Sequence, residues 1–312
     1  MPLCAAGYET HPAYVAFETR MVRDHGFDSG ALRQLFAQAA RKDSILEAIA
    51  RPAEKRLTWG EYRKIFLTQS RIDGGVAFWR ENEPALARAV VQYGVPAEIV
   101  TAIIGVETRY GGNMGRYRVI DALSTLAFDY PPRSEFFTGE LEQYLLMTRE
   151  QGYDPLALTG SYAGAMGLGQ FIPTSFRHFA VDFDADGHTD IWSNRTDAIG
   201  SVANYFKLHG WQTGGEVATL ADVVGPVVAE RMNQGLDPNV QVAELATLGL
   251  SPRVTLPQQE MVLPLALEID GNNEYWLGRQ NFHVITRYNR SQLYAMAVYQ
   301  LSREIRAGFV GR

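Results

Sequence analysis

The chain has 312 residues, of which 46% are hydrophobic and 21% charged, a composition typical of a soluble globular protein with about two domains. Its 29 Lys and Arg against 35 Asp and Glu give a net charge of -6. This charge argues against nucleic acid as the main partner and against adsorption to an anionic membrane. The single cysteine, Cys4, excludes an intrachain disulfide and a zinc site made of cysteines.

The first two hundred residues are predicted to be mainly helical. Apolar residues recur at helical spacing between residues 12 and 50. Thr58 and Glu61 match a capping box, which predicts that a helix begins there. One further helix is predicted from about Val76 to Tyr93, and the next is predicted to open with Pro96 as its first residue.

The helix that opens at Pro96 carries a carboxylate on its apolar face. Glu107 follows Ile103 by four residues and Ile104 by three, so its side chain is expected on the buried stripe. Burial disfavours the charged form and raises the pKa of a carboxyl group, which suits a general acid near neutral pH. The periodicity alone favours a buried structural glutamate that pairs with Arg109 or another arginine, and the neighbouring loops of glycine, aromatic and amide residues favour the catalytic role.

A glycine-rich segment covers residues 160–171, with glycines at 160, 164, 167 and 169. Glycine lets the backbone approach a ligand or another helix closely, and both roles stay open here. The segment lacks the Lys-Ser/Thr ending of a phosphate-binding loop, so a nucleotide site is not favoured. Ser161 and Gln170 are neutral hydrogen-bonding residues that suit a polyhydroxy or amide substrate.

An aspartate-rich segment at residues 182–190 matches the calcium loop of an EF-hand. Its acids alternate, and Gly187 stands at the sixth position, where the loop must turn sharply. Ser193 replaces the usual glutamate at position 12, so an acid further along must complete the shell. An acidic surface turn is the alternative. The predicted ligands of a structural Ca²⁺ are Asp182, Asp184, Asp186, His188 and Asp197.

After Gly214 and Gly215 the pattern changes to short β-branched stretches separated by prolines. These stretches predict a small sheet-containing module, and a helical pattern returns from Ser291 to Ile305. Within the module, strands are predicted at 240–242, 253–256 and 260–263, a turn at 270–273, and one helix near 221–230.

Four motifs in register resemble the lytic murein transglycosylase B family: residues 105–111, residues 163–171, the aspartate loop with 197–201, and residues 284–289. The resemblance runs from about residue 10 to the end. It implies a mainly α fold with a lysozyme-like catalytic core and an EF-hand-like calcium loop. The implied domains are an N-terminal helical domain (1–75), the core (76–213, with the calcium loop at 182–197), a small α+β insertion (214–280) and a return to the core (281–312).

The same resemblance implies the activity. Such enzymes cleave the β-1,4 bond between N-acetylmuramic acid (MurNAc) and N-acetylglucosamine (GlcNAc) without water and leave a 1,6-anhydro-MurNAc end. Glu107 would be the single catalytic acid and base, with calcium as a structural ion and no organic cofactor. A hydrolytic muramidase and a non-catalytic, calcium-stabilised peptidoglycan-binding protein are the alternatives. The implied substrate-binding residues are Ser161, Gln170, Tyr205, Tyr288, Asn289 and Tyr294, with Tyr62 and Arg133 further out.

Two departures from the family pattern concern the site. Relatives often have paired arginines where this chain has Pro132 and Arg133, so one contact to sugar or peptide is expected to be missing. The calcium loop is also one residue longer before Asp197 than is usual, which makes this aspartate the least secure of the ligands.

A peptidoglycan substrate implies the periplasm, in a soluble or an outer-membrane lipid-anchored form. Residues 1–4 show no signal peptide, and Cys4 would be either a lipid attachment point or an artificial residue at the start of the chain. The expected partners are glycan strands and muropeptides, with cell-wall synthases as candidate protein partners. We expect a monomer that does not bind nucleic acid.

Overall fold

The structure is a computed structural model that describes residues 7–50 and 57–311, so Cys4 lies outside the described residues. The described chain forms two compact units, and each consists of two separate segments. Unit 1 comprises residues 7–50 and 111–198, and unit 2 comprises residues 57–110 and 199–311. The division into four domains stays a prediction.

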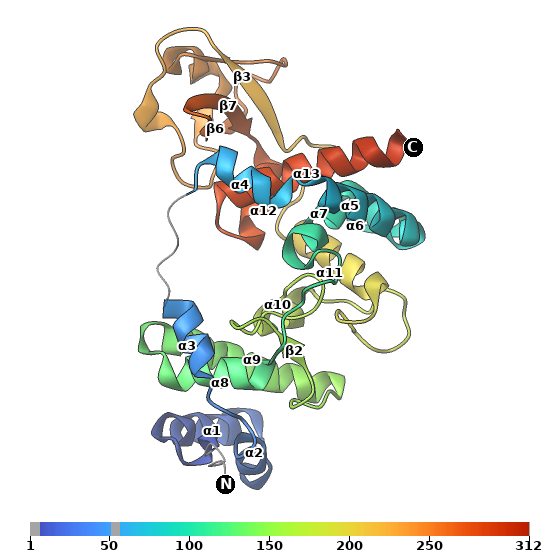
Figure 1. Cartoon of the computed structure of the whole chain (residues 1–312), viewed down its shortest axis with the longest axis vertical. Helices are drawn as coiled ribbons and strands as arrows, with labels where there is room; N and C mark the ends of the chain where they lie inside the picture. Colours follow the sequence, from blue (N-terminus) through green and yellow to red (C-terminus); the bar gives the residue numbers. More distant parts are fainter. Residues whose placement is uncertain (1–6, 51–56, 312) are drawn as a thin grey trace. The chain divides into compact units, whose positions relative to one another are not determined.

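Unit 1 is mainly helical (Figure 1). Its two central helices, α8 and α9, pack against each other and bury Leu123, Leu126, Leu141 and Tyr144. Before them in the chain, the predicted helical region 12–50 consists of three helices. The helices are α1 (Pro12–His25), α2 (Ser29–Phe36), α3 (Asp43–Ala50), α8 (Val119–Asp129), α9 (Ser134–Gln151) and α10 (Pro173–Phe179), and the strands are β1 (Tyr117–Arg118) and β2 (Thr159–Gly160).

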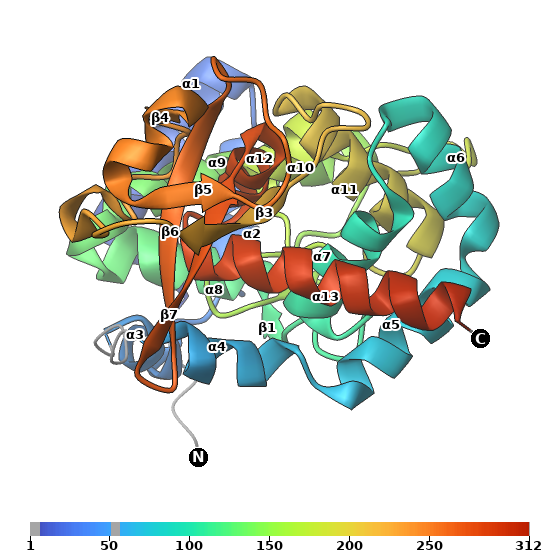
Figure 2. The ribbon, with the colours of Figure 1, turned by 90° about the horizontal axis from the view of Figure 1, so that it is seen from above.

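Unit 2 combines helices with a sheet. Its longest helix, α13 (Gln292–Val310), packs against four others, α4, α5, α7 and α12 (Figure 2). Nearly every residue of α7 is buried, which makes this helix the centre of the unit. The other helices are α4 (Trp59–Phe66), α5 (Gln69–Glu81), α6 (Glu83–Tyr93), α7 (Ala97–Thr108), α12 (Gln280–Tyr288) and most of α11 (Arg195–Leu208).

The predicted capping box is confirmed. Thr58 Oγ1 accepts a hydrogen bond from the Glu61 amide at 3.3 Å, and the Glu61 carboxylate accepts one from the Thr58 amide at 2.9 Å. Such a pair satisfies two amides that a helix start would otherwise leave unbonded. Pro96, by contrast, is the N-cap of α7 rather than its first helical residue.

The predicted single helix from Val76 to Tyr93 is wrong, because two helices, α5 and α6, cover this segment. Asn82 leaves the helical conformation and its side chain donates to the carbonyl oxygen of Phe78 at 2.7 Å. Pro84 follows in the first turn of α6, and a proline cannot donate the bond that would continue α5. Gly94 ends α6 as expected, in the left-handed conformation with φ of 73°.

The predicted sheet module is confirmed as a five-stranded antiparallel sheet in the order β4-β6-β7-β3-β5. Asp270 and Gly271 both have positive φ and form the tight turn between β6 and β7, where the sequence predicted a turn. The strands are β3 (Ala218–Val223), β4 (Val240–Gln241), β5 (Leu250–Pro252), β6 (Met261–Ile269) and β7 (Asn272–Gly278).

Two predicted elements inside this module are wrong. Instead of a helix near 221–230, β3 extends to Val223, and only a short 3₁₀ turn, η3 (Ala229–Arg231), follows. β3 pairs with β7 on one side and β5 on the other, so its backbone bonds are satisfied by distant partners. The predicted strand at 253–256 is absent from the described strands, since β5 ends at Pro252.

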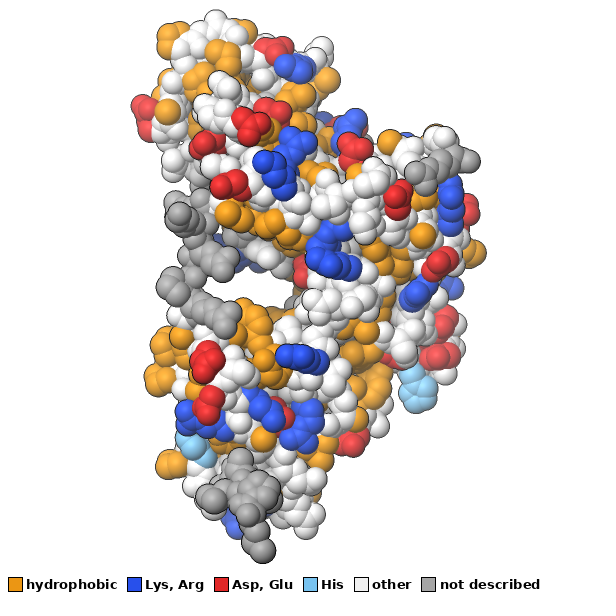
Figure 3. All heavy atoms as spheres, in the orientation of Figure 1, with side chains coloured by type: hydrophobic (Ala, Val, Ile, Leu, Met, Phe, Trp, Pro, Cys, Tyr) orange, Lys and Arg blue, Asp and Glu red, His pale blue; other side chains and the backbone are white. Residues whose placement is uncertain are grey.

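The surface carries both signs of charge. In the view of Figure 3, Lys and Arg side chains are interspersed with Asp and Glu. Among the described residues, no single helix has the length and apolar character needed to cross a membrane. α6 and α7 meet that condition only when taken together, and they are bent by 115° at their junction.

Candidate active site

Glu107 lies in the last turn of α7, as the sequence predicts. The helix ends because Arg109 and Tyr110 adopt the left-handed conformation, with φ of 52° and 61°. Their amides bond back to the carbonyl oxygens of Gly105 and Ile104. Two successive non-glycine residues in this conformation are costly, so the surrounding structure must hold them in place.

Arg71 and Tyr110 hold this helix end. The Tyr110 hydroxyl donates to the Arg71 carbonyl oxygen at 2.7 Å, and Arg71 Nη1 donates to the Gly105 carbonyl oxygen at 2.5 Å. A positive group at the C-terminus of a helix also interacts favourably with the helix dipole. The Tyr110 ring needs small neighbours, since a Cβ at Gly105 would lie 2.5 Å from its hydroxyl. Sequence reasoning missed both residues, and Gly74, Gly75 and Gly105 were the signal for a bulky neighbour.

The Glu107 carboxyl group has one hydrogen-bond partner among the described residues, the Tyr294 hydroxyl, which donates to Oε1 at 2.5 Å. Burial raises the pKa of Glu107 to about 7, and the Tyr294 bond acts in the opposite direction. No arginine pairs with Glu107 in the described part of the chain, so the structure does not support the alternative of a structural ion pair. A carboxyl group that is half protonated near neutral pH can both give and take a proton.

Tyrosines form the surroundings of Glu107. Burial, then the Glu107 charge, raise the pKa values of Tyr288 and Tyr294 well above the ordinary value, and the same two causes raise the pKa of Tyr62. The Tyr205 ring lies 4.7 Å from the Tyr288 ring, and its hydroxyl donates to the Arg287 carbonyl oxygen at 2.6 Å. Four predicted substrate residues, Tyr62, Tyr205, Tyr288 and Tyr294, therefore gather around the predicted acid.

Asn289 and His209 lie beside these tyrosines. Asn289 ends α12 and is exposed, directly after Tyr288. His209 stacks on the Tyr205 ring, with a centroid distance of 4.0 Å, and was not predicted. Burial lowers the pKa of His209, which favours its neutral form.

Replacing Tyr294 by Phe should move the pH profile of activity. The Tyr294 hydrogen bond lowers the pKa of Glu107, so without this bond the pKa should rise from its value of about 7. The alkaline limb of the rate profile should then shift to higher pH, and kcat at pH 7 should fall about tenfold because the carboxylate form loses its donor. The rate at which soluble muropeptides are released between pH 5 and 9 measures the position of the alkaline limb and kcat at pH 7. Tyr275→Phe on β7 is the matched control. An unchanged pH profile in Tyr294→Phe would contradict the expected role of Glu107 as the acid tuned by Tyr294.

Three predicted substrate residues lie in unit 1, each held by local contacts. Ser161 Oγ accepts the amides of Ala163 and Ala165. Gln170 has a positive φ of 52°, and its side chain donates to two backbone carbonyl oxygens. The Arg133 guanidinium lies over the ring of Phe136, 4.5 Å from its centroid. Their part in substrate binding stays a prediction.

The glycines around Ser161 serve tight packing. A Cβ at Gly160 would lie 2.3 Å from the Ala165 carbonyl oxygen, and one at Gly167 would lie 2.5 Å from the Ile191 carbonyl oxygen. Gly167 also has a φ of 68°, which disfavours other residues. The packing role that the sequence left open is thus present.

The aspartate loop brings three of its acids together. One carboxylate oxygen from each of Asp182, Asp184 and Asp197 lies within 4.8 Å of the others. Asp186 and His188 are not in this group, and the Asp186 carboxylate instead accepts the His188 amide at 2.8 Å. Whether these two contribute ligands stays a prediction.

The loop fits a hard cation. Asp197 is buried and accepts the amides of Phe183 and Asp190 at 2.7 and 2.8 Å. Burial raises the pKa of its carboxyl group, and the charges of Asp184 and Asp182 add to this effect. Gly187 turns the chain with a φ of 95°. Clustered carboxylate oxygens on such a turn are the ligands that Ca²⁺ prefers.

Comparison with known proteins assigns most of the chain to one family. The family model described as Transglycosylase SLT domain matches residues 9–303. The membrane-bound lytic murein transglycosylase B of Escherichia coli (strain K12) is 45% identical over 307 residues, which cover 96% of this chain and 84% of the relative.

Solved structures agree with this result. The catenated lytic transglycosylase SltB1 of Pseudomonas aeruginosa matches with a TM-score of 0.94 and 53% identity over 97% of this chain and 99% of its own. The E. coli lytic transglycosylase Slt35 in complex with calcium matches at 0.91 and 45% identity, over 98% and 96%. SltB3 of P. aeruginosa in complex with NAG-NAM-pentapeptide matches at 0.83 and 30% identity, over 96% and 79%.

Proposed function

Because this chain belongs to the transglycosylase SLT domain family and is a lytic murein transglycosylase, we propose that it cleaves the MurNAc-GlcNAc bond of peptidoglycan without water. The product would be a glycan with a 1,6-anhydro-MurNAc end, and Glu107 would be the single acid and base. One observation carries this proposal: a half-buried carboxyl group with a pKa of about 7 whose hydrogen-bond partner is a tyrosine.

The proposed reaction has two proton transfers through Glu107. First, the protonated carboxyl group gives its proton to the oxygen that leaves with GlcNAc, while the substrate's own N-acetyl oxygen stabilises the positive charge at C1 of MurNAc. Glu107, now a carboxylate, then takes the proton of the C6 hydroxyl, and the C6 oxygen closes on C1. The acid is regenerated and no water is consumed, so atoms and charges balance.

The tyrosines support both steps. The Tyr294 hydroxyl bonds Oε1 of Glu107, and Oε2 has no hydrogen-bond partner among the described residues, which leaves it able to carry the proton. The raised pKa values of Tyr288 and Tyr294 keep these side chains neutral, so they act as donors and not as competing bases. We propose that Tyr62, Tyr205 and Tyr288 contact the sugar.

A hydrolytic mechanism would need a second carboxylate. Hydrolytic glycosidases place two of them about 5–9.5 Å apart around the bond. Among the described residues no other acid perturbs the pKa of Glu107. This arrangement favours a reaction in which the substrate supplies its own nucleophile.

The products of peptidoglycan digestion test the proposal. Mass spectrometry should find muropeptides that end in 1,6-anhydro-MurNAc, since ring closure replaces addition of water. A hydrolase would instead give reducing ends that are heavier by one water. Binding of the glycan without release of soluble muropeptides would indicate the non-catalytic alternative.

A calcium site, further substrate contacts and the compartment are also part of the proposal. We propose that Asp182, Asp184 and Asp197 hold a structural Ca²⁺, supported by their geometry and by the calcium complex of Slt35. Asp186 and His188 are proposed as further ligands, and Ser161, Gln170, Asn289 and Arg133 as substrate contacts. Peptidoglycan as the ligand and the periplasm as the compartment are proposed because relatives act on murein or bind its fragments.

A further inference from the structure

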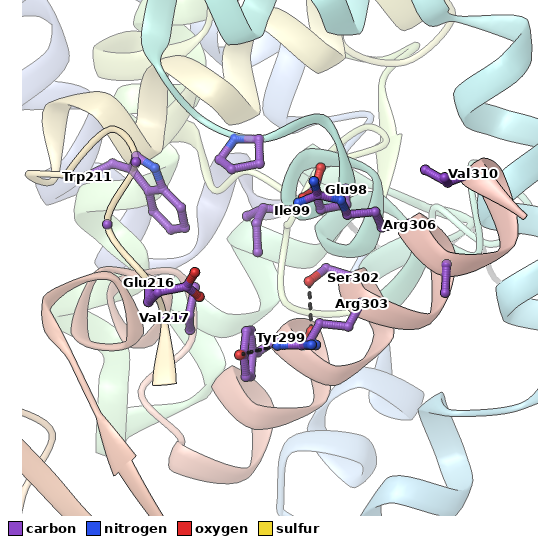
Figure 4. A pocket seen from close by; sticks show the side chains of 14 residues that line it. Glu98, Ile99, Trp211, Glu216, Val217, Tyr299, Ser302, Arg303, Arg306 and Val310 are labelled. Atoms are coloured by element: carbon purple, nitrogen blue, oxygen red, sulfur yellow. Dashed lines mark hydrogen bonds and ion pairs between the residues drawn. The ribbon is translucent and has the colours of Figure 1, made fainter. Parts of the chain in front are cut away.

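Two cavities in unit 2 differ in how their charges are satisfied. The first, of about 600 Å³, lies at the N-terminal end of α7 and against α13 (Figure 4). Here Arg306 pairs with Glu98 at 3.0 Å, and Arg303 donates to the Tyr299 hydroxyl at 3.0 Å. Glu216 also lines this cavity and its charge acts on Arg303, so each of the two arginines has an acid of the same cavity acting on it.

The second cavity, of about 580 Å³, is formed by the start of α4, the turn between α12 and α13, and β6. Trp59, Leu267 and Leu293 supply apolar surface. Asn233 fixes one wall, since its side chain exchanges two hydrogen bonds of 3.0 Å with the backbone of Ala266. Gln292 donates to the Gly235 carbonyl oxygen at 2.6 Å and ties α13 to the same wall, so the cavity is preformed.

The second cavity carries an unpaired charge of each sign. Arg290 and Glu268 both line it and both are exposed, and neither side chain has a hydrogen bond or ion pair to another described residue. An arginine beside apolar surface, with all five donors available, is well suited to a carboxylate. A glutamate on the same cavity suits an ammonium group.

Helices α4 and α13 carry residues of this cavity and also residues around Glu107. Trp59 of the cavity and Tyr62 of the site are three residues apart on α4, hence on neighbouring positions of one helix face. On the other wall, Ser291 of the cavity caps α13 by accepting the Tyr294 amide at 3.2 Å, and Tyr294 bonds Glu107. Ser291 of the cavity thus contacts the residue that bonds the Glu107 carboxyl group.

We propose that this cavity binds the peptide of a peptide-bearing glycan, with a peptide carboxylate on Arg290 and a peptide ammonium group on Glu268. The inference rests on the proposed function, because the substrate there is peptidoglycan. In a peptide-bearing glycan the carboxyl group of MurNAc is joined to the peptide, so the sugars carry no charge. The peptide itself supplies both a carboxylate and an ammonium group. A five-residue peptide reaches up to about 17 Å when extended, so it can extend well beyond the sugar that carries it.

Binding to the Glu107→Gln variant tests the proposal independently of turnover. Calorimetry would compare NAG-NAM-pentapeptide with the same disaccharide without peptide, its lactyl carboxylate capped as an amide, and with the pentapeptide form after amidation of its carboxylates or acetylation of its amine. Adding Arg290→Ala should weaken binding of the peptide-bearing ligand about tenfold and leave the bare disaccharide unchanged. Amidation of the peptide carboxylates should weaken binding as Arg290→Ala does. Glu268→Gln should also weaken binding of the peptide-bearing ligand, and acetylation of the peptide amine should have the same effect.

Arg80→Ala on α5, an exposed arginine of the same unit, is the matched control, and melting curves verify that each variant folds. Equal weakening of both ligands by Arg290→Ala would overturn the proposal in favour of a sugar site, and no change in either would overturn it entirely. A wild-type protein that binds the peptide through Arg290 but releases no muropeptides would refute the proposed function while leaving the cavity's role intact.

Discussion

Glu107→Gln should abolish the release of muropeptides, with a loss of at least about a thousandfold at pH 6–7. Glutamine keeps the size of the side chain and can accept the Tyr294 hydrogen bond, but it can neither give a proton to the leaving oxygen nor take one from the C6 hydroxyl. Both steps of the proposed reaction therefore fail. Digestion of purified peptidoglycan followed by mass spectrometry measures the loss.

The same substitution should make the protein more stable at alkaline pH. The pKa of Glu107 is about 7 in the folded chain against an ordinary 4.5, so the folded state holds the proton more tightly than the unfolded state does. Wild-type stability should consequently fall as pH rises from about 4.5 through 7, whereas the glutamine of the variant does not titrate. Above pH 7 the variant should gain on the order of 1–3 kcal/mol, with little difference at pH 4.5.

Melting curves at pH 4.5 and 8 measure this difference, with Glu135→Ala, an exposed acid, as the control. Wild-type activity in the folded Glu107→Gln variant would contradict the catalytic role. A stability difference that is the same at both pH values would instead show that the Glu107 carboxyl group is not held protonated.

Calcium should stabilise the protein, and Asp197→Ala should remove that stabilisation. At a concentration one hundred times the dissociation constant, an ion that binds only the folded state adds about 2.7 kcal/mol. For a chain of this size that corresponds to an increase in Tm of about 5 °C or more. Asp197 contributes an oxygen to the acidic cluster and also accepts two amides, so its loss should lower the Tm even without calcium.

Differential scanning calorimetry with added chelator or calcium measures these shifts. Glu135→Ala should respond to calcium as the wild type does, because it lies outside the loop. A wild-type Tm that neither chelator nor calcium changes would count against the site. A calcium response that persists in Asp197→Ala would instead assign the ion to the remaining aspartates of the loop.

Features set by neighbouring residues could be predicted from the sequence. The capping box of Thr58 and Glu61 and the turn at Asp270 and Gly271 each depend on a few adjacent residues, and both are confirmed. β3 could not be predicted in this way, because its strand conformation depends on pairing with β5 and β7 far along the chain. The break at Asn82 was missed because the apolar pattern continues through it.

In the candidate site, too, contacts between distant residues could not be predicted from local sequence. Helical spacing alone predicted the apolar face that carries Glu107, but its partner Tyr294 lies 187 residues away. Only the family resemblance pointed to this tyrosine. Arg71 and Tyr110, which hold the end of α7, were missed because their contacts join separate helices, although the three glycines around Tyr110 were visible in the sequence.

The discontinuous make-up of unit 2 has a consequence for synthesis of the chain. α7 is almost entirely buried in the finished protein, yet α13, which packs against it, begins roughly 180 residues later. At about 5–20 residues per second, this apolar helix waits on the order of ten seconds or more for α13, with only α5 and α6 of its neighbours already made. Unit 1, whose last residue is Ala198, can be complete by then. The segment that bears the acid therefore leaves the ribosome with the face that α13 later covers still exposed.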